Sequence, residues 1–391
     1  MTVYILGSAR TAIGALMGSL SSVPAHKLGS VVISEALKRS NLSPDKIDEI
    51  IMGNILQAGQ GQGPGRQAAI GAGVPDTVPA WAINQLCGSG LKTVALAHDA
   101  IKAGTAECMV AGGMESMSMS PHLADVRKPT AFGNLTLRDS MLADGLTDVF
   151  SGEHMGMTAE WLADEFKISR EEQDKFAAES QRRVAAAWDK GLFDEEIVSV
   201  EVPQRKKDTL IINKDEHFRP STTFESLSKL RPAFKKDGSV TAGNASGIND
   251  GAAALVIASE DFVNKHSLKP VARIVSHATT GLNPSKMGLG PVSATELALK
   301  KAGWKVSDLE RVEANEAFAV QSLAVIKQLG LDPEKTNVNG GAIALGHPIG
   351  ASGARILVTL LHEMKRSNKT KGAATLCVGG GMGVSLLVER M

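Results

Sequence analysis

Two related stretches of sequence decide the fold: Cys87-Gly88-Ser89-Gly90-Leu91-Lys92 and Gly350-Ala351-Ser352-Gly353-Ala354-Arg355. Each opens a segment whose apolar residues have helical spacing. About 20–30 residues after each comes a second related pair, Val110-Ala111-Gly112-Gly113-Met114 and Val378-Gly379-Gly380-Gly381-Met382. A repeated order of motifs indicates a duplicated structural unit. We therefore predict two similar halves that pack with pseudo-twofold symmetry around a shared cleft.

Strand-like and helix-like segments alternate along most of the chain, which is typical of an α/β protein with helices on both faces of a mainly parallel sheet. Residues 119–244 differ in kind, because they are rich in Met, Asp and Pro and contain one clear helix. A capping box of Ser169 and Glu172 predicts that helix over 169–190. We expect 119–244 to be an inserted loop domain. The predicted division is a first half over 1–118 completed by 245–268, the loop domain over 119–244, and a second half over 269–391.

The composition excludes several classes of function. The 391 residues balance 42 Lys and Arg against 42 Asp and Glu, so no overall field favours nucleic acid or an anionic membrane surface. No apolar run reaches the ~18 residues of a transmembrane helix. Three cysteines, an odd number, argue against a disulfide scaffold and for a reducing compartment. The N-terminus reads directly as a strand without a targeting segment, so we expect a cytoplasmic protein.

Cys87 is the first candidate for chemistry. It directly precedes a predicted helix that runs through Val94 and Ile101. The helix dipole and the unpaired N–H groups at a helix start are expected to lower the pKa of the thiol from ~8.5 toward neutrality, which would make a nucleophile. The competing interpretation is a small buried hydrophobic side chain. The helix start and the flanking glycines make the two interpretations about equally favoured.

His347 and Cys377 are the next candidates. His347 lies at the centre of the glycine-rich segment 339–353, where an imidazole could deprotonate Cys87. Cys377 ends a predicted strand and faces a glycine-rich turn, the position at which open α/β sheets place their sites, so it could act as an acid or base. The bare N–H groups of that turn could form an oxyanion hole. The structural alternatives are a packed histidine and a core cysteine.

Asn315 and Cys108 are the remaining polar or reactive positions of interest. Asn315 stands in a polar cluster that leads into an apolar helix, where its amide could hold a water or a carbonyl oxygen, or simply cap the helix. Cys108 lacks such surroundings and is expected to be inert core. No pair of Cys or His has metal-ligand spacing, and no nucleotide fingerprint stands in the right context. We therefore expect neither a metal nor a cofactor.

These motifs identify the chain as similar to the thiolase family over nearly its whole length. The resemblance is carried by Asn84 to Leu91 around Cys87, Asn339 to Gly353 around His347, and Cys377 to Gly383. The N-terminal segment Ser8-Ala9-Arg10-Thr11 adds to it. Three long motifs in this order do not agree by chance. The resemblance implies a layered αβαβα arrangement of two halves, with a loop domain that binds coenzyme A.

The resemblance also implies a role for each motif residue. Cys87 would carry the acyl group, and His347 would activate it. With a water held by Asn315, His347 would also form the oxyanion hole for a thioester enolate. Cys377 would move the α-proton of the second substrate, and the N–H groups of Cys87 and Gly379 would form a second oxyanion hole. The residues that match the family's contacts to coenzyme A and the acyl chain are His154, Met155, Arg219, Ser226, Phe234, Ser246, Met287 and Phe318.

The chain is most similar to the biosynthetic branch of the family. That branch implies an acyltransferase that condenses two acetyl-CoA to acetoacetyl-CoA by ping-pong Claisen chemistry, without a cofactor. It also implies a homotetramer, with loops over 119–145 as the expected contacts. A degradative 3-ketoacyl-CoA thiolase with a longer pocket is the main alternative. A non-catalytic acyl-CoA-binding protein stays open as a remote one, whereas the second thiol at Cys377 speaks against a ketoacyl synthase.

Overall fold

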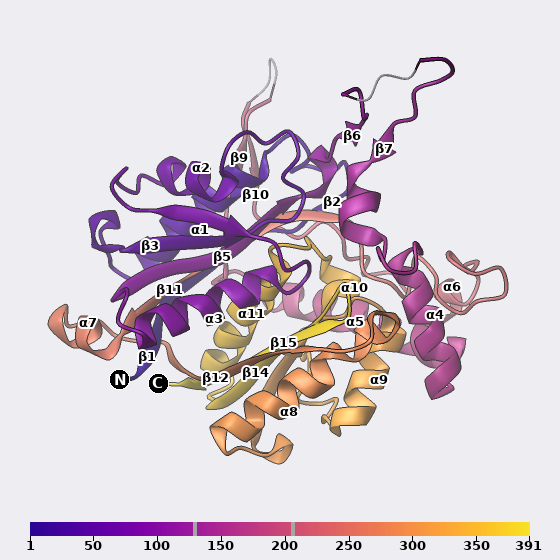
Figure 1. Ribbon diagram of the computed structural model, residues 1–391. Coiled ribbons are helices and arrows are strands. Elements are labelled where there is room, and N and C mark those ends of the chain that lie inside the picture. The colour runs from indigo at the N-terminus through magenta and orange to yellow at the C-terminus, as the bar shows by residue number, and fades with distance from the viewer. Residues whose placement is uncertain (128–130, 205–207) are drawn as a thin grey trace.

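The computed structural model describes residues 1–127, 131–204 and 208–391, and its two halves form five alternating layers of helix and sheet (Figure 1). Helices α1 (Ala25–Arg39) and α2 (Pro64–Gly71) cover one outer face, and α8 (Gly290–Ala302) and α9 (Ala319–Leu329) cover the other. Helices α3 (Ser89–Lys102) and α11 (Ser352–Arg366) lie between the two groups of strands and bury apolar side chains against both. The predicted layered αβαβα arrangement of two α/β halves is therefore confirmed.

The first half has the strand order β1-β11-β5-β3-β4. Its strands are β1 (Val3–Thr11), β3 (Glu49–Gly53), β4 (Ala80–Ile83), β5 (Cys108–Ser116) and β11 (Asn249–Ser259). Its helices are α1 (Ala25–Arg39), α2 (Pro64–Gly71) and α3 (Ser89–Lys102), and α7 (Glu260–Lys265) follows β11. Strand β11 returns from beyond the insert to pair with β1 on one side and β5 on the other. This agrees with a first half that is completed by 245–268, and the exact boundaries stay a prediction.

The second half repeats this arrangement with the order β12-β15-β14-β13. Its strands are β12 (Ala272–Gly281), β13 (Arg311–Ala314), β14 (Lys371–Val378) and β15 (Met382–Arg390). Its helices are α8 (Gly290–Ala302), α9 (Ala319–Leu329), α10 (Ala342–Leu345) and α11 (Ser352–Arg366). The halves join where β1 pairs with β12 through only two residue pairs, Tyr4 with Arg273 and Ile5 with Ala272.

The sheet is mixed, so the prediction of a mainly parallel sheet was wrong. Strands β1, β5, β12 and β14 pair antiparallel with their neighbours β11 and β15, whereas β3–β4, β3–β5 and β13–β14 are parallel. Parallel neighbours need a long crossover, usually a helix. Here the chain turns directly from β14 into β15 through Gly379–Gly381 instead, and β11 enters beside β5 from the insert.

Only one of the two repeated motif pairs lies at structurally equivalent positions in the two halves. Ser89 and Ser352 are the first residues of α3 and α11, as the duplication predicts. The second pair differs, because Val110–Met114 lies inside β5 whereas Gly379–Gly381 forms the turn after β14. The second pair of motifs is therefore similar in sequence, but its two members do not occupy equivalent positions in the two sheets.

The insert contributes helices and two small hairpins beside the body of the molecule (Figure 1). Its elements are β6 (His122–Leu123) with β7 (Arg138–Asp139), α4 (Met155–Phe166), α5 (Arg170–Asp189), β8 (Ile197–Val198), β9 (Val200–Val202) with β10 (Leu210–Ile212), and α6 (Phe224–Leu227). Helix α5 begins with the predicted capping box of Ser169 and Glu172. Among the helices of the described ranges, none is long and apolar enough to cross a membrane.

Helices α3 and α11 cross at two glycines. A Cβ on Gly90 would lie 2.7 Å from the backbone nitrogen of Ala354, and one on Gly353 would lie 2.3 Å from that of Leu91. Real Cβ atoms do not come so close to backbone, so only glycine allows this separation of the helices. The first turns of the two helices are therefore held side by side in the central layer.

Replacing Gly353 with alanine should lower stability, because the new methyl group meets rigid backbone and the helices must separate. Overpacking of this kind costs about 1–3 kcal/mol. We expect a clear fall in the midpoint of thermal unfolding of Gly353→Ala, measured by circular dichroism. Gly281→Ala is the matched control, since the nearest atom to its Cβ is 3.9 Å away. Equal midpoints for the two variants would contradict this account of the crossing.

Candidate active site

One cavity of about 540 Å³ collects most of the candidate residues. Residues of the first half, the loop domain and the second half all line it. The candidates that line it are Cys87, His154, Met155, Arg219, Phe234, Ser246, Met287, Phe318, His347 and Gly379. The structure therefore brings together residues that lie up to 292 positions apart in the sequence (379 − 87).

Cys87 lies at the start of α3, half-buried in the wall of this cavity. The residue before it, Leu86, has a positive φ of 46°, so the backbone makes a sharp, strained turn into the helix. Gly88 follows, and a Cβ there would lie 2.7 Å from Cγ2 of Val378. The helix start is thus pressed against the end of β14, the strand that carries Cys377.

The pKa of Cys87 differs from the sequence expectation. Burial raises the pKa of the thiol to about 11, while backbone N–H groups of Gly379 and of Cys87 itself act in the opposite direction. The nearby Glu115 carboxylate raises it further. Removing a thiolate from water therefore outweighs the helix-start N–H groups. The predicted lowering toward neutrality was wrong, and Cys87 is a thiol in the free protein at pH 7.

His347 has one ring nitrogen fixed and the other free. Its Nδ1 lies 2.5 Å from Oγ of Ser352, whose own hydroxyl donates to the carbonyl oxygen of Pro348 at 2.9 Å. Because the Ser352 proton is used there, Nδ1 of His347 must be the donor, which leaves Nε2 as a base. Nε2 is buried without a hydrogen-bond partner in the described part of the chain. Burial also lowers the pKa of the imidazole to about 4, so the ring is neutral at pH 7.

Two side chains outside the motifs hold the His347 loop in place. The backbone N–H of His347 donates to Oδ1 of Asn249 on β11 at 2.9 Å. The N–H of Gly350 donates to Oε2 of the buried Glu115 on β5 at 2.9 Å. Both strands belong to the first half, so this half positions a loop of the second. Sequence reasoning missed these residues; the only local signal was a carboxylate in an otherwise apolar strand.

Cys377 and Asn315 lie behind the cavity wall. Cys377 is fully buried at the end of β14, in an apolar cluster with Met287 and Phe318. Burial raises the pKa of its thiol, and the charge of a Cys87 thiolate would raise it further. Asn315 follows β13, not a helix start, and its N–H donates to the carbonyl of Thr375 at 3.0 Å. Neither amide atom of its side chain has a partner among the residues that the structure describes.

Aromatic rings and small residues form the outer part of the cavity. The ring of Phe234 stacks on His154, with centroids 4.7 Å apart, and meets Phe318 edge-on. His154 also caps α4, because its Nδ1 accepts from the N–H of Gly156. The backbone N–H of Ser246 donates to the carbonyl of Ala317, another residue that lines the cavity. Arg219 supplies a cation to a lining that is otherwise mostly apolar.

Ser226 does not line the cavity with the other candidates. It lies in α6, where its hydroxyl and backbone N–H form a capping box with Thr223. The cavity is also lined by residues that were not candidates for a functional role. These are Ala15, Leu16, Leu86, Met117, Gly145, Leu146, His217, Ala233, Ala242, Ala245, Gly247, Ile248, Ala317 and Ile349. Cys108 is buried in the core of the first half, as expected.

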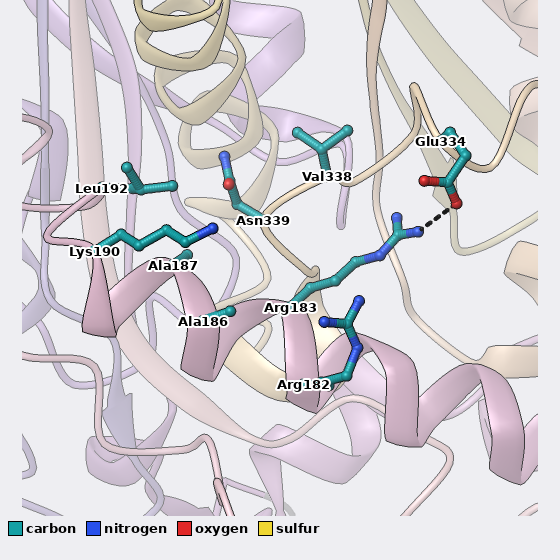
Figure 2. Close-up of a pocket in the computed structure, with 9 residues that line it drawn as sticks. All are labelled: Arg182, Arg183, Ala186, Ala187, Lys190, Leu192, Glu334, Val338 and Asn339. Atoms are coloured by element: carbon teal, nitrogen blue, oxygen red, sulfur yellow. Dashed lines mark hydrogen bonds and ion pairs between the residues drawn. The ribbon is translucent and has the colours of Figure 1, made fainter.

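A second, smaller cavity of about 210 Å³ lies apart from these residues. Figure 2 shows Arg182, Arg183 and Lys190 on α5 directed toward the segment that carries Glu334 and Asn339. Arg183 is committed to structure, because it pairs with Glu334 and donates to backbone carbonyls of the 333–337 turn. None of the candidate residues lines this cavity.

Comparisons with known proteins agree with this architecture. The family described as thiolase, N-terminal domain, matches residues 3–261, and thiolase, C-terminal domain, matches 268–390. The chain is 56% identical to the acetyl-CoA acetyltransferase of Chromobacterium violaceum over 100% of both chains. It is 54% identical to that of Shinella zoogloeoides over 99% of this chain and 98% of the relative.

Solved structures have the same fold over the full chain. The Bacillus anthracis acetyl-CoA acetyltransferase has a TM-score of 0.98 at 43% identity, covering 100% of this chain and 99% of that one. Human mitochondrial 3-ketoacyl-CoA thiolase, solved in complex with CoA, has a TM-score of 0.96 at 46% identity, covering 100% and 98%. With both family domains matched and full-length relatives above half identity, the chain belongs to the thiolase family, a family of acyltransferases.

Proposed function

We propose that this chain is an acetyl-CoA C-acetyltransferase that condenses two acetyl-CoA molecules reversibly to acetoacetyl-CoA and coenzyme A. The observation that carries the proposal is that one accessible thiol and a neutral imidazole with a free Nε2 line one cavity, while a second, buried thiol packs with Met287 and Phe318 of its wall. The names of the full-length relatives support the acetyl substrate. No cofactor is needed for the chemistry, because coenzyme A thioesters are themselves the substrates.

The first half-reaction acetylates Cys87. Nε2 of His347 takes the thiol proton as Sγ attacks the thioester carbon, and the N–H groups of Cys87 and Gly379 stabilise the developing oxyanion. The bond from the acetyl carbon to the sulfur of coenzyme A then breaks. Cys377 gives its proton to the leaving thiolate, so coenzyme A departs as a thiol. The enzyme is left with an acetyl group on Cys87, an imidazolium and a Cys377 thiolate.

The second half-reaction uses that ion pair. The Cys377 thiolate removes an α-proton from a second acetyl-CoA, and the enolate oxygen is stabilised by the His347 imidazolium together with a water held by Asn315. Each good donor of this kind is worth ~3–4 kcal/mol. The enolate carbon attacks the acetyl carbon, Cys87 leaves as a thiolate, and His347 returns its proton. Both cysteines are again thiols and the imidazole is neutral, so the protons balance.

The outer cavity suits coenzyme A and a short acyl chain. The stacked Phe234 and His154 offer an apolar wall, and Arg219 offers a cation for phosphate. Ser246 and Met155 line the same cavity. Met287 and Phe318 are both buried beside Cys377 and limit the space for the acyl group. Ser226 on α6 stays a proposed contact of the more distant part of coenzyme A.

A homotetramer and a cytoplasmic location belong to the same proposal. Large apolar side chains are exposed along the loops after β5, including Met119, Val126, Phe132, Leu135 and Leu137. Contact between copies would cover such side chains. The predicted contact segment 119–145 also includes residues 128–130, which lie outside the described residues.

The roles of the two thiols can be separated by substitution. Cys87→Ser should give no acetyl-enzyme after incubation with acetyl-CoA, read by intact-protein mass spectrometry. Cys377→Ser should still form acetyl-enzyme but lose the exchange of acetyl α-protons with deuterated water. Cys108→Ser, at a buried cysteine outside the site, is the control and should behave as the parent protein in both assays. If Cys87→Ser is acetylated and Cys377→Ser is not, the two assignments are reversed.

The acid–base scheme predicts a flat pH profile for acetylation. With a neutral thiol at a pKa of about 11 and an imidazole base at about 4, both groups keep their reactive protonation states between pH 5 and 9. Single-turnover acetylation rates should therefore vary little over this range, and fall only as the pH approaches 4. His347→Gln lacks the base and should acetylate slowly, with a rate that rises about tenfold per pH unit as thiolate appears. The same steep rise in the parent protein would contradict the scheme.

Acyl-chain length distinguishes the proposed function from a degradative thiolase. We expect much higher kcat/KM for cleavage of acetoacetyl-CoA than of long-chain 3-ketoacyl-CoA, because Met287 fills the end of the acyl site. Met287→Ala should narrow this difference by improving the longer substrate. Equal kcat/KM for short and long chains in the parent enzyme would favour the degradative alternative.

A further inference from the structure

Three potential metal ligands meet outside the active site, where the two halves face each other. His98 and Asp99 are on α3, and His277 is on β12 (Figure 1). Nδ1 of His98 lies 3.1 Å from Oδ1 of Asp99, and Nε2 of His277 lies 2.8 Å from the same oxygen. All three donor atoms lie within 4.8 Å of one another. In the described ranges, no other group of three or more such residues is placed in this way.

The two separations to Asp99 are close to those between neighbouring ligands of a tetrahedral site. Bonds of ~2.0–2.1 Å to nitrogen and oxygen separate neighbouring ligands by ~3.3 Å. The two separations to Asp99 are only a few tenths of an ångström shorter, so a small outward movement of the rings would admit an ion. The histidine side chains are 12% and 14% exposed, and that of Asp99 is 54% exposed. The two histidine ligands are therefore held inside the protein, and the exposed side of the site leaves one coordination position for water.

The arrangement of the two imidazole rings suits metal binding. Nδ1 of His98 and Nε2 of His277 both face the Asp99 carboxylate, and a metal ion binds the neutral form of imidazole. Each ring now directs an N–H at the carboxylate, because a carboxylate only accepts. On binding, each neutral ring would carry its proton on the opposite nitrogen and present a lone pair to the ion. Two rings and one carboxylate make a donor set suited to Zn²⁺, Co²⁺ or Ni²⁺ rather than to Ca²⁺ or Mg²⁺.

Nearby lysine side chains repel a bound cation, and the Asp99 carboxylate offsets part of that repulsion. Lys92, Lys102 and Lys301 are near enough to disfavour positive charge on the histidines. All three ammonium groups are directed elsewhere: Lys92 toward Oγ1 of Thr279, Lys102 toward the carbonyl of Met1, and Lys301 toward the carbonyl of His277. Asp99 supplies one negative charge directly at the site. We therefore expect affinity short of that of a closed structural zinc site.

We propose that His98, Asp99 and His277 form a binding site for a divalent transition metal ion, with Zn²⁺ as the ion that fits best. The ion would bridge α3 of the first half to β12 of the second, near the place where the halves share only two residue pairs. His98 lies eleven residues along α3 from Cys87, which is roughly 16 Å of helix. The metal therefore has no part in the acyl transfer and acts on the contact between the halves.

Titration with Zn²⁺ and Co²⁺ tests this site in the full chain. Isothermal titration calorimetry should give one Zn²⁺ per chain for the parent protein, and at least about tenfold weaker binding for His277→Gln and for Asp99→Asn. The bound Co²⁺ spectrum should lack sulfur-to-cobalt charge transfer and stay unchanged after Cys87 is alkylated with iodoacetamide. Zn²⁺ should also raise the thermal unfolding midpoint of the parent protein, and should leave that of His277→Gln unchanged.

His122→Gln is the matched control, because His122 is an exposed histidine on the distant hairpin of β6. It should bind Zn²⁺ as the parent protein does. Retained condensation activity in His277→Gln and Asp99→Asn would show that these variants are folded. The proposal is wrong if the parent protein binds no Zn²⁺, if both variants bind it as tightly as the parent, or if alkylation of Cys87 removes the Co²⁺ signal.

Discussion

The close crossing of α3 and α11 is the constraint on which the rest of the molecule depends. Because Gly90 and Gly353 let the two backbones touch, the first turns of both helices lie side by side in the central layer. Cys87 lies two residues before one helix, and the loop before the other carries His347. The same arrangement presses the start of α3 against the end of β14, where Cys377 lies. The absence of side chains at these two glycines thus allows the reactive groups of both halves to lie close together.

The site that results is buried and electrically neutral at rest. Desolvation keeps Cys87 and Cys377 as thiols and His347 as a free base, against the pull of backbone N–H groups on the sulfur of Cys87. These side chains therefore become charged only during the reaction, and not before the substrate binds. Fixed donors around the acyl group can stabilise that charge when it forms, which is where such donors are most effective.

Much of this arrangement could be predicted from local sequence, and the failures have physical causes. The glycine-rich motifs located Cys87, His347 and Gly379, because unusual backbone leaves a strong local pattern. The sheet directions, the high pKa of Cys87 and the supports of the His347 loop from Glu115 and Asn249 depend on tertiary neighbours, which no local pattern records. Asp99 and His277 are likewise brought together by folding across 178 positions, so spacing rules could not find them.

The placement of β11 has a consequence for synthesis of the protein in the cell. This strand separates β1 from β5, yet it ends only at Ser259. While a ribosome is still making the insert, the nascent chain holds two strands with open edges and no partner between them. Open apolar edges attract other chains. The first half must therefore wait for two-thirds of translation before it can close, and until then the edges of β1 and β5 that β11 will cover stay open.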